Sequence, residues 1–226
     1  MLLRALGPTL AQFGITDPLQ DPTIELHAGN GSLLSSNDNW KDTQQAAISA
    51  TGKAPPDDKE SAVLSNNLAA GNYTAIVRGK NNTTGVGLVE AYDLDESVPI
   101  TLTNISTRGF VDTNQNVMIA GFISGNGIVK VIVRALGPTL SQFNVPNVLA
   151  DPTLEVRDVQ GNLLASNDNW KDTQQADIQA TGFAPPDDKE SAIIIERPPA
   201  STTAIVRGKN NTTGNALVEV YFIPNS

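Results

Sequence analysis

The stretch LRALGPTLAQF, Leu3–Phe13, returns as VRALGPTLSQF, Val133–Phe143. The second stretch lies 130 residues after the first, and this register continues without a gap to Ala62 and Ala192. One residue is then lost, the match resumes at TAIVRGKNNTTG, and the copies close in LVEAY and LVEVY. Self-similarity at a fixed spacing is typical of repeated structural units. The chain of 226 residues therefore contains two copies of one unit.

A segment that separates the two copies has no counterpart ahead of the first copy. It contains three apolar stretches, LTNISTRGFV, NVMIAGFISG and IVKVIVRAL, which predict strands. The triplet Gly125-Asn126-Gly127 predicts a tight turn that joins the last two strands as a hairpin. We therefore expect a first module at residues 1–97, which lacks N-terminal strands, and a second at 98–226, which has extra strands at 102–130.

The remaining segments are short, rich in β-branched residues, and interrupted by Gly, Pro or Asn at intervals of roughly 8–12 residues. In PTLEVRD, Leu154 and Val156 alternate with Glu155 and Arg157, as in a strand with one buried face. The Asn-Gly and Gln-Gly pairs that follow these strands predict hairpins with GSLLSS and GNLLAS. The pattern predicts an all-β fold of two tandem jelly-roll-like β-sandwich modules.

One short helix is expected in each module, over TQQAAISA and TQQADIQA. Asp42 and Asp172 precede these stretches and could cap the helices by accepting backbone N–H bonds. Gly52 and Gly182 follow them and should end the helices.

The order of motifs resembles tandem repeats of secreted bacterial proteins. The resemblance is carried by RALGPTL, at Arg4–Leu10 and Arg134–Leu140, and by NDNW, at Asn37–Trp40 and Asn167–Trp170. More loosely, the chain is similar to the bacterial pre-peptidase C-terminal domain, a jelly-roll-like β-sandwich. The resemblance implies a non-catalytic module that is extracellular or at the cell surface, and it makes calcium a candidate ligand.

Composition narrows the classes of partner. The chain carries 15 basic and 24 acidic residues, and its net charge of −9 repels phosphate backbones, so nucleic acid is not an expected partner. No apolar run reaches the roughly 18–20 residues of a membrane helix, so we expect no membrane span, and the chain shown has no signal segment. It contains no cysteine, which excludes disulfides and thiolate metal sites.

The inventory of side chains gives little support to catalysis. The one histidine, His27, has Arg157 as its counterpart, so no His-based site is duplicated. No Gly-rich phosphate loop and no nucleophile elbow is present. Paired carboxylates could hydrolyse a glycosidic bond, but every one recurs in the other copy, and two complete glycosidase sites in such small modules are not expected. We therefore expect no enzymatic activity.

The carboxylates of the repeated loops are better suited to binding a hard cation than to catalysis. Calcium prefers six to eight oxygen ligands from loops, and NDNWKD and PPDDKE supply carboxylates and amides. The candidate ligands are Asn37, Asp38, Asn39, Asp42, Asp57, Asp58 and Glu60 in the first copy, and Asn167, Asp168, Asn169, Asp172, Asp187, Asp188 and Glu190 in the second.

A structural reading of these loops stays open beside the cation site. Asp and Asn commonly bond their own backbone without an ion. Trp40 and Trp170 are expected to plug the loops, and Arg4 and Arg134 to pair with one of the loop acids.

The missing strands motivate the functional hypothesis. The first module begins at LLRAL without the preceding hairpin, so we expect an unpaired strand edge that another copy covers. Such a contact is head-to-tail and builds a homopolymer: a filament, tube or layer at the cell surface. The alternative is a binding or adhesion module excised from a longer secreted repeat protein. The predicted assembly residues are Leu2, Leu3, Leu6, Val117, Ile119 and Phe122.

Overall fold

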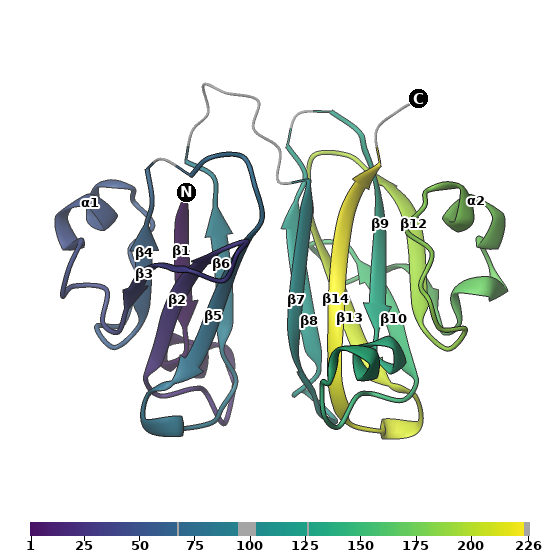
Figure 1. Ribbon diagram of the computed structural model, residues 1–226, viewed down its shortest axis with the longest axis horizontal. Helices are drawn as coiled ribbons and strands as arrows, with labels where there is room; N and C mark the ends of the chain where they lie inside the picture. Colours follow the sequence, from purple (N-terminus) through teal and green to yellow (C-terminus); the bar gives the residue numbers. More distant parts are fainter. Residues whose placement is uncertain (67, 95–102, 126, 224–226) are drawn as a thin grey trace. The chain divides into compact units, whose positions relative to one another are not determined.

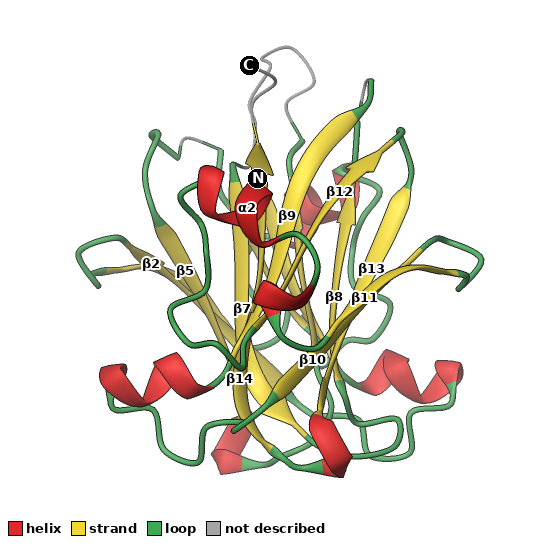
Figure 2. Ribbon diagram, turned by 90° about the vertical axis from the view of Figure 1, so that its right-hand side faces the viewer, coloured by secondary structure: helices red, strands yellow, loops and turns green. Residues whose placement is uncertain are grey.

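The structure is a computed structural model that describes residues 1–66, 68–94, 103–125 and 127–223. The chain divides into two compact units, Met1–Ile100 and Thr101–Ser226, which we call module 1 and module 2 (Figure 1). The described residues form four sheets and two short α-helices, α1 at Gln45–Ala50 and α2 at Gln175–Ala180. Strands make up most of the fold in Figure 2, where the helices drawn in red include short 3-10 segments. The predicted all-β fold is confirmed. Residues Val98 and Asn126, used above to set the boundary and the turn, lie outside the described residues.

Module 1 is a sandwich of two three-stranded antiparallel sheets, ordered β4-β1-β6 and β3-β2-β5. Its interior holds Leu3 and Ala5 from one sheet and Ile24 and Leu26 from the other, because these side chains alternate with outward-facing neighbours. The strands are β1 Leu2–Leu6, β2 Pro22–Ala28, β3 Leu33–Asn37, β4 Ser61–Leu64, β5 Tyr73–Gly79 and β6 Leu88–Tyr92.

Module 2 is a sandwich of two four-stranded antiparallel sheets, ordered β12-β9-β14-β7 and β11-β10-β13-β8. The strand pairs of module 1 recur in module 2, so β9 corresponds to β1, β14 to β6 and β13 to β5. The strands are β7 Asn104–Val111, β8 Met118–Ile123, β9 Val129–Leu136, β10 Pro152–Arg157, β11 Leu163–Asn167, β12 Ser191–Arg197, β13 Ser201–Gly208 and β14 Gly214–Ile223.

The extra strands of module 2 are therefore β7 and β8, one at the edge of each sheet. All three predicted strands of this segment are present, but the predicted hairpin between the last two is wrong. Strand β8 pairs with β13 and strand β9 pairs with β12 and β14, so the turn carries the chain from one sheet to the other. The physical reason is that Met118 and Phe122 of β8 face the same interior as Val131 and Val133 of β9 from the opposite sheet.

The prediction that LLRAL lacks a partner is also wrong. Strand β1 lies in the centre of its sheet, where Leu3 pairs with Val63 of β4 and with Ala91 of β6. Leu2, Leu3 and Leu6 are buried in module 1 itself. In the part of the chain that the structure describes, the missing strands leave one edge of β5 and one edge of β6 unpaired, because β5 and β6 correspond to β13 and β14, which pair with β8 and β7.

The helices begin differently from the prediction. The residue before α1 is Gln44, no side chain caps the helix, and Asp42 instead accepts a hydrogen bond from Asn39. The side-chain amide of Gln44 exchanges two bonds with the backbone of Leu64, which fixes the helix to strand β4. Gly52 has a φ of +67° and follows the helix end, as predicted.

Candidate functional site

The two repeated loops meet around a buried tryptophan. The backbone N–H of Trp40 donates to the carbonyl of Glu60 at 2.9 Å, and its Nε1 donates to the carbonyl of Asp57 at 3.1 Å. Trp170 makes the same two bonds in module 2, to Glu190 and Asp187. Both indoles are buried, so their predicted role as loop plugs is confirmed.

Glu60 is a fully buried carboxylate that sequence reasoning placed among surface cation ligands. Its Oε1 accepts backbone N–H bonds from Gly7 at 3.1 Å and Thr9 at 3.0 Å, and its Oε2 accepts from Asp57 at 3.2 Å. The glutamate therefore ties the PPDDKE loop to the ALGPT turn. Because its oxygens are turned toward backbone donors, no surface cation can reach it in this arrangement.

Glu190 repeats this arrangement in module 2 and adds a contact from Thr139, whose Oγ1 donates to Oε2 at 2.9 Å. The turn itself requires glycine, because a Cβ at Gly137 would lie 2.1 Å from the carbonyl oxygen of Leu149. No feature of the polar sequence around the glutamate marks it as buried.

The loop aspartates each have a partner of their own. Lys80 Nζ lies 2.5 Å from an Asp38 oxygen and 3.9 Å from Asp21, and the hydrogen bond with Asp38 raises the pKa of the lysine. Lys41 pairs with Asp58. Module 2 repeats these contacts as Lys209 with Asp168 and Asp151, Lys171 with Asp188, and Asn169 with Asp172.

The remaining candidates complete the loop bonding. Asn37 accepts from the backbone of Ala62 and donates to the carbonyl of Asn39, and Asn167 does the same in module 2. Asp57 Oδ1 accepts from the backbone of Lys59. Within the residues that the structure describes, no three His, Cys, Asp or Glu side chains gather closely enough to hold a metal ion.

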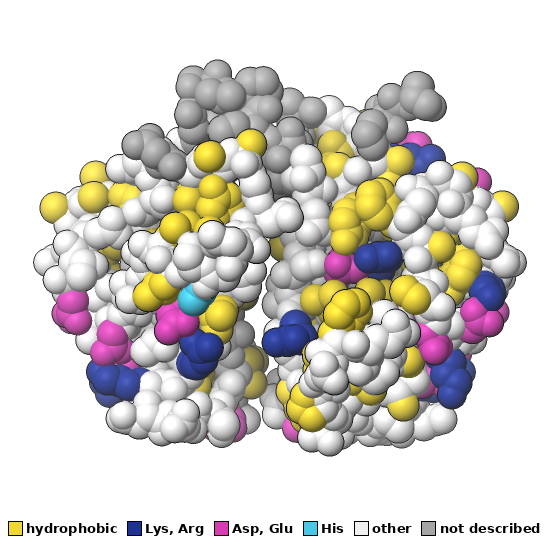
Figure 3. Space-filling model, in the orientation of Figure 1, with side chains coloured by type: hydrophobic (Ala, Val, Ile, Leu, Met, Phe, Trp, Pro, Cys, Tyr) yellow, Lys and Arg dark blue, Asp and Glu magenta, His cyan; other side chains and the backbone are white. Residues whose placement is uncertain are grey.

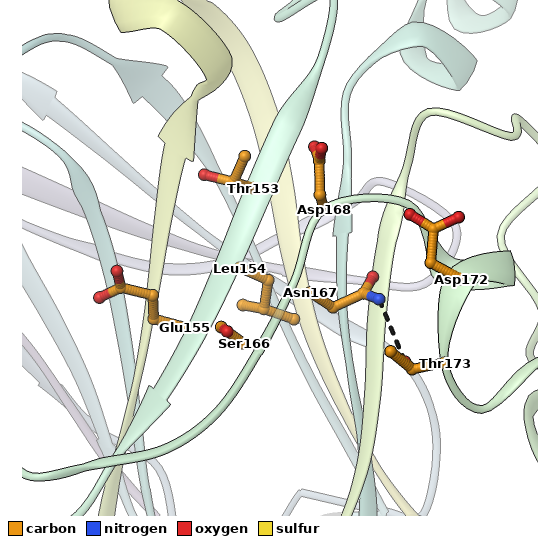
Figure 4. Close-up of a pocket in the computed structure, with 8 residues that line it drawn as sticks. All are labelled: Thr153, Leu154, Glu155, Ser166, Asn167, Asp168, Asp172 and Thr173. Atoms are coloured by element: carbon orange, nitrogen blue, oxygen red, sulfur yellow. Dashed lines mark hydrogen bonds between the residues drawn. The ribbon is translucent and has the colours of Figure 1, made fainter.

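An open pocket of about 310 Å³ lies on module 2 beside these residues (Figure 4). Its walls come from β10, from β11 and from the loop that follows β11. Asn167 donates to Thr173 across one side at 3.3 Å. The lining residues are Thr153, Leu154, Glu155, Ser166, Asn167, Asp168, Asp172 and Thr173.

A second charged group links the central strand of each module to the closing strand. Arg134 on β9 bonds Glu219 on β14 and the carbonyl of Phe183, and it lies over the ring of Tyr221. Arg4 makes the same contacts with Glu90, Lys53 and Tyr92. The expectation that these arginines pair with a loop acid is wrong, because their strands place them opposite the closing strand.

One further donor to this group comes from the extra strand β7 of module 2, where Ser106 donates to Glu219 at 2.7 Å. Among the described residues of module 1, no strand lies on this side of β6, so Glu90 has no equivalent donor from a strand.

The histidine lies on the outer face of β2. His27 Nε2 is 3.0 Å from an oxygen of Glu25, and Arg78 contacts the same carboxylate at 2.9 Å. Figure 3 shows this group on the surface of module 1, with the histidine in cyan. The hydrogen bond with Glu25 raises the pKa of His27, and the reciprocal bond lowers the pKa of Glu25. The chemistry of this group is that of a surface ion pair.

The chain was compared with known proteins. No family model matches it, and no curated protein matches it. Among solved structures, the pre-peptidase C-terminal domain of a collagenase from Bacillus anthracis is similar, with 10% identity and a TM-score of 0.34, over 52% of this chain and 88% of that chain. The VP2 subviral particle of infectious bursal disease virus matches with 8% identity and a TM-score of 0.21, over 98% of this chain and 56% of that chain.

None of the described helices is long and apolar enough to cross a membrane.

Proposed function

We propose that this chain is a non-catalytic structural subunit, extracellular or at the cell surface, that assembles with copies of itself by pairing β-strands. The observation that supports the proposal is the difference between the closing strands of the two modules. Val89 in β6 is 37% exposed, whereas its counterpart Val218 in β14 is 1% exposed. Ala91 is exposed and its counterpart Val220 is buried.

These exposed side chains belong to the interior of the sandwich. Val89 pairs with Ala5 and Ala91 pairs with Leu3, and both partners lie in the core of module 1. Side chains of paired residues in a sheet share a face, so Val89 and Ala91 face the core too. Module 1 is therefore a sandwich with one open side. Exposed apolar interior and unpaired strand edges favour association with another chain.

The proposal is tested on the purified chain by sedimentation and negative-stain microscopy over a range of concentrations. We expect filaments, tubes or layers that grow with concentration. A chain that stays monomeric and fully folded at millimolar concentration would contradict the proposal.

A binding or adhesion module from a longer secreted repeat protein is the second candidate. It is supported by the open pocket on module 2, whose walls carry Glu155, Asp168 and Asp172. These acids are bonded to Arg157, Lys209 and Asn169, which a ligand would have to displace. A screen of glycans and cationic peptides by calorimetry tests it, with Asp168→Asn as the variant expected to abolish binding. Calcium in the loops is proposed with either candidate, and it requires Lys80 and Lys209 to leave their aspartates.

A further inference from the structure

Module 1 has four sheet edges, and the one at β4 is closed by side chains of its own loops. Asn37 accepts a hydrogen bond from the backbone N–H of Ala62 at 2.9 Å. Gln44 accepts from the backbone N–H of Leu64 at 2.9 Å and donates to its carbonyl at 2.8 Å. Proteins commonly protect an edge strand in this way, by covering it with a helix or loop.

The edges at β5 and β6 have no such protection. In the described part of the chain, no backbone hydrogen bond from another segment reaches the outer side of either strand. In module 2 the matching edges are covered by added strands. There Ile205 of β13 pairs with Ile119 of β8, and Val218 of β14 pairs with Thr107 of β7. Module 2 therefore shows that a strand pair such as β7 and β8 can complete this side of the sandwich.

The added strands also close the interior. Val111 of β7 and Met118 and Phe122 of β8 are buried in the core of module 2. The core of module 1 contains no residue from this position, because the two strands are absent. A suitable partner for module 1 must therefore bring two strands, one for each sheet, with apolar side chains between them.

We propose that this partner is the β7 and β8 edge of a second copy, so that β6 pairs with β7 and β5 pairs with β8 of the neighbouring molecule. This inference rests on the proposed self-assembly and names its surfaces. Strands β7 and β8 are edge strands, so each has one paired side and one free side. They can pair with module 1 of another copy without leaving their own module.

The numbers of free strand edges favour pairing between intact modules over a domain swap, in which β7 and β8 would leave their own module and insert into module 1 of another copy. Each chain offers two accepting edges, β5 and β6, and two donating edges, β7 and β8. An exchange would complete module 1 only by removing the same strands from module 2. Edge-to-edge pairing keeps module 2 intact. Inside an assembly, each β5 and β6 edge then pairs with a β8 or β7 edge of the next copy.

The outer side chains on the two surfaces are also compatible. Strands β7 and β8 carry exposed apolar side chains at Phe110, Ile119 and Ile123. Strand β6 carries Leu88 on its outer face, opposite to the core, and this side chain is partly exposed. Burial of such side chains against each other removes apolar surface from water. Because the accepting and donating surfaces differ, the contact is head-to-tail and propagates from copy to copy into a ring or an open filament.

The contact is tested first by cross-linking, because the chain contains no cysteine and an introduced one is unique. Leu88→Cys on β6 and Phe110→Cys on β7 are made in separate chains, mixed, and treated with a short bismaleimide. We expect a heterodimeric product from the mixture. Leu33→Cys replaces Leu88→Cys in the matched control, because Leu33 lies on the opposite edge strand, β3, and is 55% exposed. An equal yield from the control overturns the inference.

Lysine substitutions test the same surfaces by assembly. Val89→Lys places a charge on the core side of β6, at a position that is exposed in the single chain and buried in the proposed contact. It should raise the concentration needed for assembly by about tenfold or more, because an unpaired ammonium resists burial. Ile119→Lys places a charge on the outer face of β8, where the contact would add an apolar neighbour, and it should raise the same concentration by a smaller factor. Leu33→Lys should leave it unchanged. Circular dichroism and thermal melting confirm that each variant is folded.

The outcomes separate the two proposals. If the unmodified chain does not assemble, the proposed function fails. If it assembles and Val89→Lys and Ile119→Lys assemble equally well while folded, the proposed function stands and the surfaces named here are wrong. A cross-link that forms only within one chain, in the Leu88→Cys, Phe110→Cys double variant, also overturns the inference.

Discussion

The buried carboxylate of Glu190 accepts a hydrogen bond of 3.0 Å from the backbone N–H of Thr139. Glu60 and Thr9 repeat this contact at the same distance in module 1. A carboxylate that satisfies several backbone donors is hard to replace, because its removal leaves those donors buried without partners. The conserved geometry in both copies makes the glutamate the group that fixes the turn after the first strand.

Replacing Glu60 or Glu190 by glutamine should destabilise its module. Glutamine offers one acceptor oxygen and turns an N–H group toward backbone donors. We expect the free energy of unfolding to fall by about 1.5–3 kcal/mol, the usual loss for a hydrogen bond to a charged group. Urea unfolding followed by tryptophan fluorescence measures it. The control Asp58→Asn, at an exposed acid of the same loop, should cost less than about 0.5 kcal/mol; an equal loss in both would contradict the prediction.

The arginine–glutamate pairs should contribute unequally. The side chain of Glu219 is 8% exposed and that of Glu90 is 23% exposed, because β7 covers only the first. Removal of one partner from a buried pair costs about 3–5 kcal/mol, and Arg134→Ala should approach this range. Arg4→Ala should cost less, because water can solvate Glu90. Denaturant unfolding of the two variants compares them, and equal losses would show that β7 does not alter the environment of the pair.

The contribution of His27 to stability should depend on pH. Its pKa is raised above the ordinary value of 6.5 by the bond to Glu25, so the folded state binds the proton more tightly than the unfolded state. The stabilisation is complete below pH 6.5 and is lost as the pH rises through the raised pKa. His27→Arg, which copies Arg157 of module 2, should remove this dependence. Melting from pH 5 to 9 tests it; an unchanged pH profile in the variant would be evidence against the ion pair.

Calcium in the repeated loops predicts an effect of chelation. A ligand that binds only the folded state raises stability by mass action, so EDTA should lower the melting temperature of the chain as isolated. Lys80→Gln should then bind calcium more tightly, because it frees Asp38. An unchanged melting temperature, with no metal by elemental analysis, would remove calcium from the proposal.

The local structure of the chain could be predicted from its sequence. The turn at Asn30-Gly31 correctly places β2 and β3 in a hairpin, and the alternation in PTLEVR correctly separates buried from half-buried side chains. These features depend on neighbours in the sequence. The assignment of strands to sheets does not, and proximity suggested that β8 pairs with β9. In the structure β8 and β9 do not pair. They lie in opposite sheets, and their apolar side chains face the same interior.

The loops were harder to interpret for a similar reason. Asp42 stands where it could cap a helix that begins at Thr43, but the helix begins at Gln45, and Asp42 accepts a hydrogen bond from Asn39 instead. Glu60 stands among exposed aspartates in PPDDKE, and only the folded chain shows that it points inward. The choice between an ion ligand and a backbone acceptor depends on which loops meet, and a single sequence does not contain that information.

The edge position of β7 has a consequence for the order of events during synthesis. Strand β7 pairs with β14, and Asn104 is paired with Tyr221. The sheet of module 2 therefore cannot form completely until Tyr221 has been synthesised. All strands of module 1 are complete at Tyr92. Contacts between residues distant in the chain slow folding, and domains fold in the order in which a ribosome releases them. Module 1 is therefore folded, with two strand edges exposed, while the rest of the polypeptide is still being translated.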